Sequence, residues 1–82
     1  MKLRRGKNEY KLPAYGQVLQ VYILGRDYIV PLYHVRLSEI GDKSELGVPA
    51  IFVLTPRWII FYPTPDRAYE VKVRYTPPVR EL

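Results

Sequence analysis

Residues 47–75 read GVPAIFVLTPRWIIFYPTPDRAYEVKVRY. The last seven, from Tyr69 to Tyr75, alternate between apolar or aromatic side chains and charged ones. This period of two, built from β-branched and aromatic residues, is typical of a strand with one buried face. Residues 49–54 and 58–62 are two further runs of strand formers, and short proline-containing gaps separate the three runs. The stretch therefore predicts an antiparallel β-meander whose middle strand, 58–62, is covered on both faces.

The N-terminal half contains shorter runs of the same kind. Val18 to Tyr33 is apolar on either side of a Gly-Arg-Asp turn and predicts a second hairpin. Pro31 should lie at an edge or bulge of that hairpin, because proline lacks the N–H donor. Residues 9–13 predict a short edge strand that ends at proline. Residues 35–40 predict a single helical turn, and residues 42–47 predict a polar loop.

These elements predict an all-β protein. Five or six short strands with one short helical turn favour a small antiparallel sandwich or a partly open barrel. A length of 82 residues allows one domain at most. We expect a basic flexible arm over residues 1–8, a single β-domain over residues 9–78 and a C-terminal tail over residues 79–82. Eight prolines beside one asparagine, two glutamines and one methionine are also typical of thermophilic proteins.

The positive charge of the chain is concentrated at its N-terminus. The formal net charge is +5, from 13 basic and 8 acidic residues. Four of the basic residues lie in the first seven positions, and without them nine basic residues remain against eight acidic ones. Either this arm contacts nucleic acid or an acidic partner, or it is a solvated terminus. The four residues are Lys2, Arg4, Arg5 and Lys7.

Residues that usually carry catalysis are scarce. Cysteine is absent, which excludes disulfides, thiolate metal ligands and thiol nucleophiles. His34 is the only histidine and has no acid beside it, and Ser38 and Ser44 are the only serines. Asp42 and Glu45, in the predicted polar loop, would bind a hard cation only weakly. We therefore expect no enzymatic activity, no catalytic residues, no cofactor and no metal site.

A small β-domain that binds nucleic acid is the alternative function. Exposed aromatic side chains between basic residues can stack on bases while the basic groups neutralise phosphates. Tyrosines on strands serve equally well as half-buried core or interface residues whose hydroxyls reach water. The residues that would form a nucleic-acid-binding face are Tyr10, Tyr15, Tyr22, Tyr28, Tyr33, Lys11 and Arg26.

Three segments together resemble a known protein family. They are GVPAIF at residues 47–52, WIIFYPTPDRAY at residues 58–69 and VKVRY at residues 71–75. In this order they resemble the β-domain of the tailed-bacteriophage head–tail connector proteins, also called adaptor or tail-tubular proteins. The predicted upstream hairpin and helical turn occur in the same order as in that family, so the resemblance covers residues 9–78.

The resemblance implies a structural virion protein. Such a subunit would assemble with copies of itself in a ring around the DNA exit channel and bind a portal or tail protein, in a virion assembled in the host cytoplasm. The basic arm would face the portal or contact DNA without sequence specificity. No membrane partner is expected, because the apolar runs are far shorter than the ~20 residues of a membrane span. The residues expected to form the framework or an interface are Trp58, Phe61, Tyr62 and Tyr69.

Overall fold

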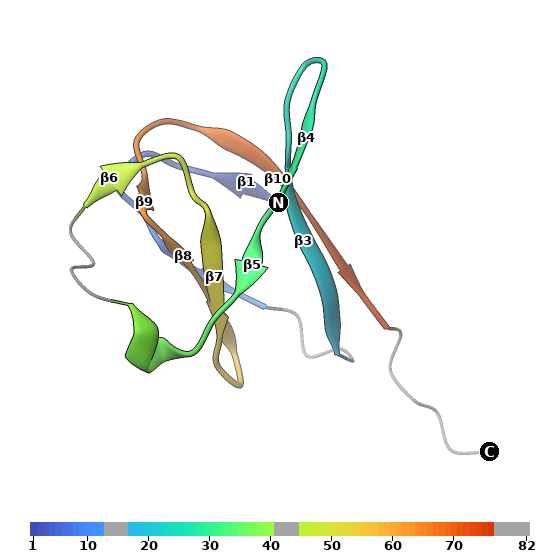
Figure 1. The fold of residues 1–82 in the computed structure, drawn as a ribbon, viewed down its shortest axis with the longest axis vertical. Helices are drawn as coiled ribbons and strands as arrows, with labels where there is room; N and C mark the ends of the chain where they lie inside the picture. The colour runs from blue at the N-terminus through green and yellow to red at the C-terminus, as the bar shows by residue number, and fades with distance from the viewer. Residues whose placement is uncertain (13–16, 41–44, 77–82) are drawn as a thin grey trace.

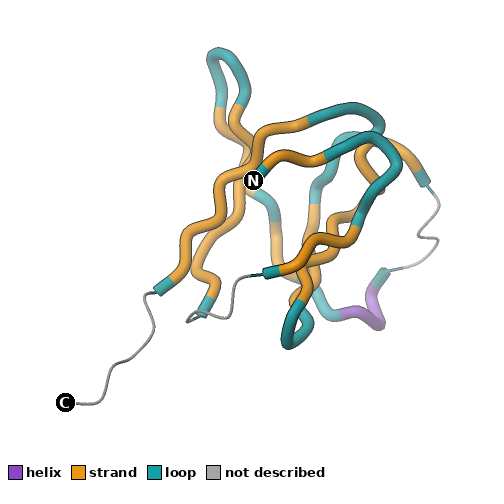
Figure 2. Tube along the Cα trace, turned by 180° about the vertical axis from the view of Figure 1, so that it is seen from behind, coloured by secondary structure: helices purple, strands orange, loops and turns teal. Residues whose placement is uncertain are grey.

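The computed structural model describes residues 1–12, 17–40 and 45–76. These residues form an all-β fold with ten short strands and one 3-10 turn, which confirms the predicted fold class (Figures 1 and 2). The strands are more numerous and shorter than expected. Their bounds are β1 (Lys2–Leu3), β2 (Glu9–Lys11), β3 (Val18–Leu24), β4 (Ile29–Pro31), β5 (Tyr33–His34), β6 (Leu46–Gly47), β7 (Ile51–Leu54), β8 (Trp58–Tyr62), β9 (Thr64–Pro65) and β10 (Tyr69–Tyr75), and the 3-10 turn is η1 (Leu37–Glu39).

Two four-stranded sheets form a sandwich. One has the strand order β1-β10-β3-β4 and the other β2-β8-β7-β5, while β6 and β9 form a small two-stranded sheet. Among the described residues no sheet closes on itself, so the architecture is a sandwich and not a barrel. Most strand pairs are antiparallel, but β5 pairs with β7 and β6 pairs with β9 in parallel.

The predicted three-strand meander is only partly correct. β7 and β8 do form a hairpin, with Phe52 opposite Phe61. β10, however, pairs with β3 and β1 in the other sheet. The free side of β8 is already occupied by β2, where Tyr10 lies opposite Ile59. Residues 63–66, which include β9, therefore carry the chain from one sheet to the other instead of turning it back.

The second hairpin forms as predicted, but it is shorter. β3 pairs with β4, which is the edge strand of its sheet, so Pro31 lies at an edge as expected. After β4 the chain leaves this sheet at Leu32, whose N–H still donates to Val21 O at 2.9 Å. Tyr33 then donates its N–H to Ala50 O at 3.2 Å and begins β5 in the other sheet. The predicted edge strand at residues 9–13 is present as β2.

The segment after β5 differs in detail from the expectation. The helical turn is the three-residue η1, in which Arg36 N–H donates to Glu39 Oε2 at 2.7 Å. In Figure 1, η1 lies on the side of β7 and β8 that faces away from β3 and β10. The end of the predicted polar loop is a strand instead, because residues 46–47 form β6 against β9. Residues 42–44 of that loop lie outside the described residues.

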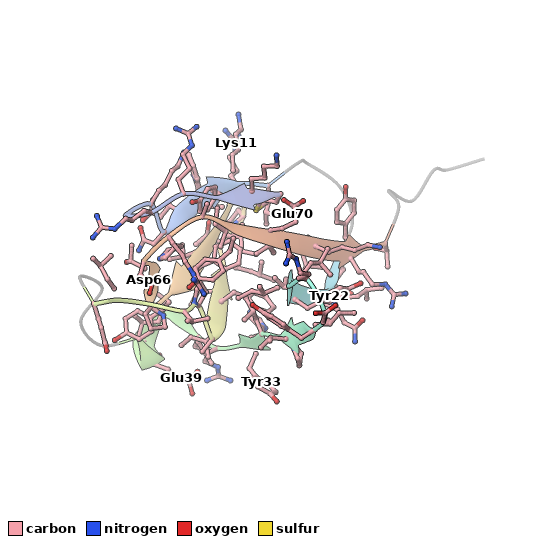
Figure 3. All side chains as sticks on the ribbon, turned by 90° about the horizontal axis from the view of Figure 1, so that it is seen from above. Lys11, Tyr22, Tyr33, Glu39, Asp66 and Glu70 are labelled. Atoms are coloured by element: carbon pink, nitrogen blue, oxygen red, sulfur yellow. The ribbon has the colours of Figure 1, made fainter. Side chains whose placement is uncertain are left out.

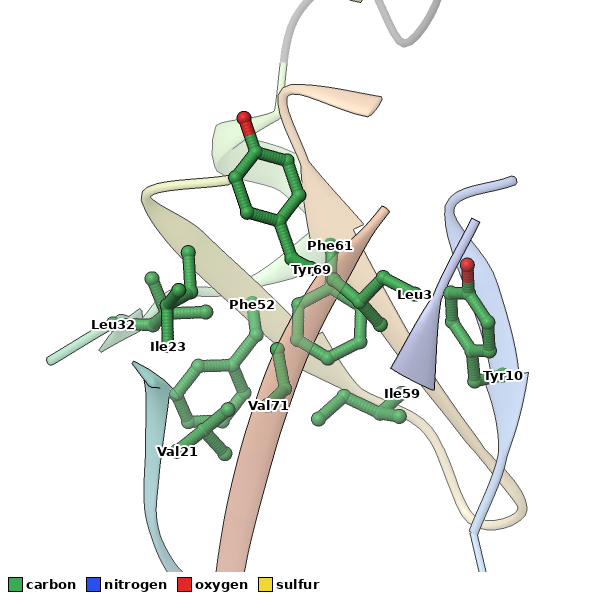
Figure 4. Close-up of a cluster of buried hydrophobic side chains, with 10 residues drawn as sticks. All are labelled: Leu3, Tyr10, Val21, Ile23, Leu32, Phe52, Ile59, Phe61, Tyr69 and Val71. Carbon is green, nitrogen blue, oxygen red and sulfur yellow. The ribbon is translucent and has the colours of Figure 1, made fainter. Parts of the chain in front are cut away.

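The hydrophobic core lies between the two four-stranded sheets (Figure 4). β8 is covered on both faces as predicted: Ile59 and Phe61 are fully buried toward the core, and Ile60 is buried on the opposite face together with its cross-strand partner Val53. The ring of Tyr10 meets that of Phe61 edge to face, with centroids 5.8 Å apart. The core cluster consists of Leu3, Tyr10, Val21, Ile23, Leu32, Phe52, Ile59, Phe61, Tyr69 and Val71.

The expectation of a flexible arm over residues 1–8 is wrong. β1 pairs with β10, so the arm begins as a strand of the sandwich. Met1 and Val71 exchange two hydrogen bonds, from the terminal amine to Val71 O at 2.9 Å and from Val71 N–H to Met1 O at 2.8 Å. Leu3 is only 1% exposed, and burial of this side chain holds the segment in place. The expected tail over residues 79–82 lies outside the described residues.

Candidate interaction surfaces

The sandwich has two lateral edges of different character. β1 and β2 lie at one edge, and β4 and β5 lie at the other. In Figure 3, Lys11 of β2 and Tyr33 of β5 lie on opposite sides of the molecule. The basic edge is defined here by Lys2, Arg4, Arg5, Lys7 and Lys11, and the apolar edge by Tyr28, Ile29, Val30 and Tyr33.

The basic edge contains all four residues predicted to contact nucleic acid or a partner. These four and Lys11 are exposed. Glu9 is the one acidic residue between Met1 and Leu12, and it lies in β2 beside Lys11. The structure therefore brings the predicted basic residues together along one edge, and it adds Lys11 to them.

A hydrogen-bonded turn fixes the backbone of this basic edge. Lys7 N–H donates to Arg4 O at 3.2 Å, and Gly6 has a φ of 81°, a conformation that favours glycine. The Tyr10 hydroxyl accepts from Arg4 N–H at 2.7 Å and donates to Lys7 O at 2.9 Å. Gly6 N–H donates to Pro65 O at 2.9 Å. The turn is therefore anchored both to a core tyrosine and to the crossing between the sheets.

The four expected framework residues lie in three kinds of environment. Phe61 and Tyr69 are buried in the core. Tyr62 is half-buried, and its hydroxyl donates to Glu45 Oε2 at 2.9 Å. Trp58 is 43% exposed and lies directly opposite Lys11 across the β2–β8 pair. Trp58 is thus a surface residue beside the basic edge, a role that its apolar sequence context concealed.

Asp66 and Tyr69 form a hydrogen-bonded pair after the crossing between the sheets. The Tyr69 hydroxyl donates to Asp66 Oδ1 at 2.6 Å, and Arg67 Nε donates to the same hydroxyl at 3.3 Å. Burial, followed by the bond to Asp66, raises the pKa of Tyr69 above its ordinary value. The hydrogen bond to Tyr69 also raises the pKa of Arg67. This network holds the tyrosine in its neutral, donating form.

The apolar edge exposes large side chains that a monomer would normally bury. Ile29 is 65% exposed, Tyr33 69%, Tyr28 54% and Val30 39%. Figure 1 shows the β3–β4 turn projecting beyond the rest of the ribbon. Gly25 allows Tyr28 to pack on this turn, because a Cβ at Gly25 would overlap the Tyr28 ring. Exposed aromatic and aliphatic residues gathered in this way are typical of protein interfaces.

The backbone of the apolar edge offers few hydrogen-bond donors. Gly25 N–H donates to Tyr28 O at 2.8 Å, and Leu32 N–H to Val21 O at 2.9 Å. By the alternation of an antiparallel pair, the backbone groups of Ile29 and Pro31 point away from β3. Proline has no N–H, so Ile29 alone supplies an outward donor within β4. Addition of a partner strand is therefore weakly supported here, and side-chain packing is favoured.

A groove of about 270 Å³ adjoins the apolar edge. The His34 ring stacks on Phe52 at one side of it, with centroids 5.2 Å apart and an interplanar angle of 22°. Leu19, 55% exposed, extends the apolar wall on β3. In the described part of the chain, no group of three or more His, Cys, Asp or Glu residues is placed to hold a metal ion.

The tyrosines proposed for a nucleic-acid-binding face do not form one surface. Tyr10 is buried in the core, and Tyr15 lies outside the described residues. Tyr28 and Tyr33 belong to the apolar edge, and Tyr33 lies on the side of the sandwich opposite Lys11. The cross-strand neighbour Trp58 is the aromatic residue that the structure places beside Lys11.

Comparison with family models, with curated proteins and with solved structures gave no match. Within residues 1–12, 17–40 and 45–76 there is no helix long and apolar enough to cross a membrane.

Proposed function

We propose that this protein is a structural subunit that assembles with copies of itself, in the manner of a head–tail connector of a tailed bacteriophage. In this proposal it forms a ring around a DNA exit channel, binds a portal or tail protein, and resides in a virion assembled in the host cytoplasm. The resemblance of residues 47–75 to that family motivates the choice of assembly.

The apolar edge is the observation that carries the proposal. Ile29 and Tyr33 are more than half exposed, and they lie on neighbouring strands of the two sheets at one lateral edge. Burying apolar surface stabilises an association by about 25 cal/mol per Å² before the costs of binding are subtracted. Because Pro31 removes a donor from the edge strand, we expect the neighbour to pack on these side chains and not to extend the sheet.

A second copy of the chain is the proposed neighbour. A closed ring requires a heterologous contact, in which the apolar edge of one subunit meets a different surface of the next. The apolar and basic edges lie on opposite sides of the sandwich. Each subunit of a ring has two neighbours, so the basic edge stays accessible in an assembly whose receiving surface lies elsewhere on the sandwich.

Size-exclusion chromatography with light scattering tests this assembly on the full chain, alone and with a portal or tail protein. We expect the unmodified chain to associate as its concentration rises, and Ile29→Lys to reduce that association. Val48→Lys is the matched control, since Val48 is 53% exposed and is not part of the apolar edge. A chain that stays monomeric and binds neither partner protein would disprove the proposal, as would equal effects of the two lysine substitutions.

A further inference from the structure

The basic edge has a positioned backbone, which a solvated charged tail does not have. Tyr10 is 8% exposed, and its hydroxyl bonds to both ends of the turn from Arg4 to Lys7. The Lys7 ammonium lies 5.1 Å from the centroid of the Tyr10 ring. Because the turn is already ordered before a ligand arrives, less conformational entropy is lost on binding.

The edge continues along β2 toward an exposed aromatic side chain. From Lys7 to Lys11 the chain covers about 13 Å at ~3.3 Å per residue, a length that spans several phosphates of a duplex. Trp58 is 43% exposed opposite Lys11, and the exposed Arg57 precedes it. Trp58 N–H donates to Thr55 Oγ1 at 3.0 Å and Thr55 N–H to Trp58 O at 2.9 Å, so the backbone that carries the indole is also fixed.

We propose that the basic edge binds the phosphodiester backbone of nucleic acid. Arg4, Arg5, Lys7 and Lys11 neutralise phosphates, and Trp58 stacks on an unpaired base where the ligand is single-stranded. Arginine suits this role because its planar group can donate two hydrogen bonds to one phosphate. Glu9 is the one acidic residue between Met1 and Leu12, and its carboxylate repels phosphate. We therefore expect the phosphate contacts on either side of Glu9, at the Arg4–Lys7 turn and at Lys11.

This inference does not depend on ring assembly. It rests on the basic edge, whereas the proposed assembly rests on the apolar edge on the opposite side of the sandwich. Nucleic-acid binding and self-assembly can therefore fail independently. The variants that test nucleic-acid binding leave Ile29 and Tyr33 unchanged.

Fluorescence anisotropy with labelled single-stranded and duplex DNA, titrated over a range of salt concentrations, tests the proposal. Four phosphate contacts predict a slope of log K against log salt near −3.6 for duplex DNA, at about −0.9 per contact. The test variant combines Arg4→Gln, Arg5→Gln, Lys7→Gln and Lys11→Gln. The control removes the same charge elsewhere and combines Arg26→Gln, Arg36→Gln, Lys72→Gln and Arg74→Gln.

We expect the test variant to lose most of its affinity for DNA and most of the salt dependence of that affinity. The control variant should keep most of its affinity and most of its salt dependence. Equal losses in the two variants would overturn the proposal, because they would show attraction to net charge alone. Binding to polyglutamate as tight as binding to DNA would also overturn it, since an acidic protein would then be an equally good ligand. Thermal melting of both variants establishes that they are folded.

Two single substitutions test the geometry of the site. Tyr10→Phe keeps every charge but removes the hydroxyl that holds the turn, so we expect weaker binding with an unchanged salt slope. Unchanged affinity in this variant would show that the order of the turn is irrelevant. Trp58→Ala should weaken binding to single strands by about fivefold to a hundredfold and leave duplex binding nearly unchanged. Equal effects on the two ligands would remove Trp58 from the site.

Discussion

The Tyr69 hydroxyl donates a 2.6 Å hydrogen bond to Asp66 Oδ1, immediately after the chain has crossed from one sheet to the other. The crossing itself is held by Asp66 N–H, which donates to Gly47 O at 3.1 Å, and by Thr64 N–H, which donates to Glu45 O at 2.9 Å. Side-chain and backbone bonds therefore meet at one junction. Residues 63–66, which lie within the predicted meander, are thus the segment that joins the two layers of the sandwich.

The Asp66–Tyr69 bond predicts a loss of stability at high pH. Because the pKa of Tyr69 is raised in the folded state, the fold favours the neutral phenol. The stabilisation is complete below the unfolded pKa of about 10 and is lost as the pH rises through the higher folded value. Urea unfolding between neutral and strongly alkaline pH measures this effect. In Tyr69→Phe the alkaline loss should be smaller, and an identical pH profile in that variant would contradict the assignment.

Removal of one partner of this bond should also be measurable at neutral pH. Asp66→Ala leaves the Tyr69 hydroxyl without its acceptor, and we expect the free energy of unfolding to fall by about 1–3 kcal/mol. Urea denaturation measures the change. Asp27→Ala is a suitable control, because Asp27 is an exposed turn residue for which a change within about 0.5 kcal/mol is expected. Equal effects of the two substitutions would argue against a structural role for the bond.

Phe61 and Trp58 should respond very differently to truncation, although both lie in β8. Phe61 is fully buried, so Phe61→Ala leaves a cavity and should lower the free energy of unfolding by about 3–5 kcal/mol. Trp58 is 43% exposed, and Trp58→Ala should cost much less. Chemical denaturation of the two variants gives both numbers. A larger loss for Trp58 than for Phe61 would contradict the register of β8.

The N-terminal segment should contribute to stability and not only to charge. Leu3 is 1% exposed in the core, so Leu3→Ala should destabilise the fold by about 2–5 kcal/mol. Lys2→Ala is the matched control, because the neighbouring Lys2 is exposed and its substitution should change stability by less than about 0.5 kcal/mol. Thermal and urea unfolding measure both variants. A solvated arm would instead give the same small effect at the two positions.

Gly25→Ala should alter the apolar edge more than it alters stability. The added Cβ overlaps the ring of Tyr28, which is 54% exposed and free to move away. We expect self-association to weaken, with the free energy of unfolding changed by less than about 1 kcal/mol. Light scattering and denaturation measure the two effects separately. In a Tyr28→Ala background the same alanine should have no further effect on association, and an undiminished effect there would contradict the steric explanation.

The pattern of side chains along the chain predicts the longer strands, but it does not predict the two-residue strands β1, β6 and β9. The alternation from Tyr69 to Tyr75 and the apolar run from Trp58 to Tyr62 each predict β-structure, because side-chain period follows directly from strand geometry. Proline positions were equally informative, since the missing N–H restricts Pro31 to an edge strand. The all-β class and the β3–β4 hairpin could therefore be predicted.

The pairing of those strands depends on tertiary packing. An alternating strand such as β10 presents the same pattern to any neighbour, so its pairing with β3 in place of β8 left no local signal. The burial of Leu3 also depends on tertiary packing. Leu3 is an apolar residue among basic ones, and it reaches the core only because β1 pairs with β10. The basic edge is likewise a product of packing: Lys11 and Trp58 are 47 positions apart in sequence and adjacent only because β2 pairs with β8.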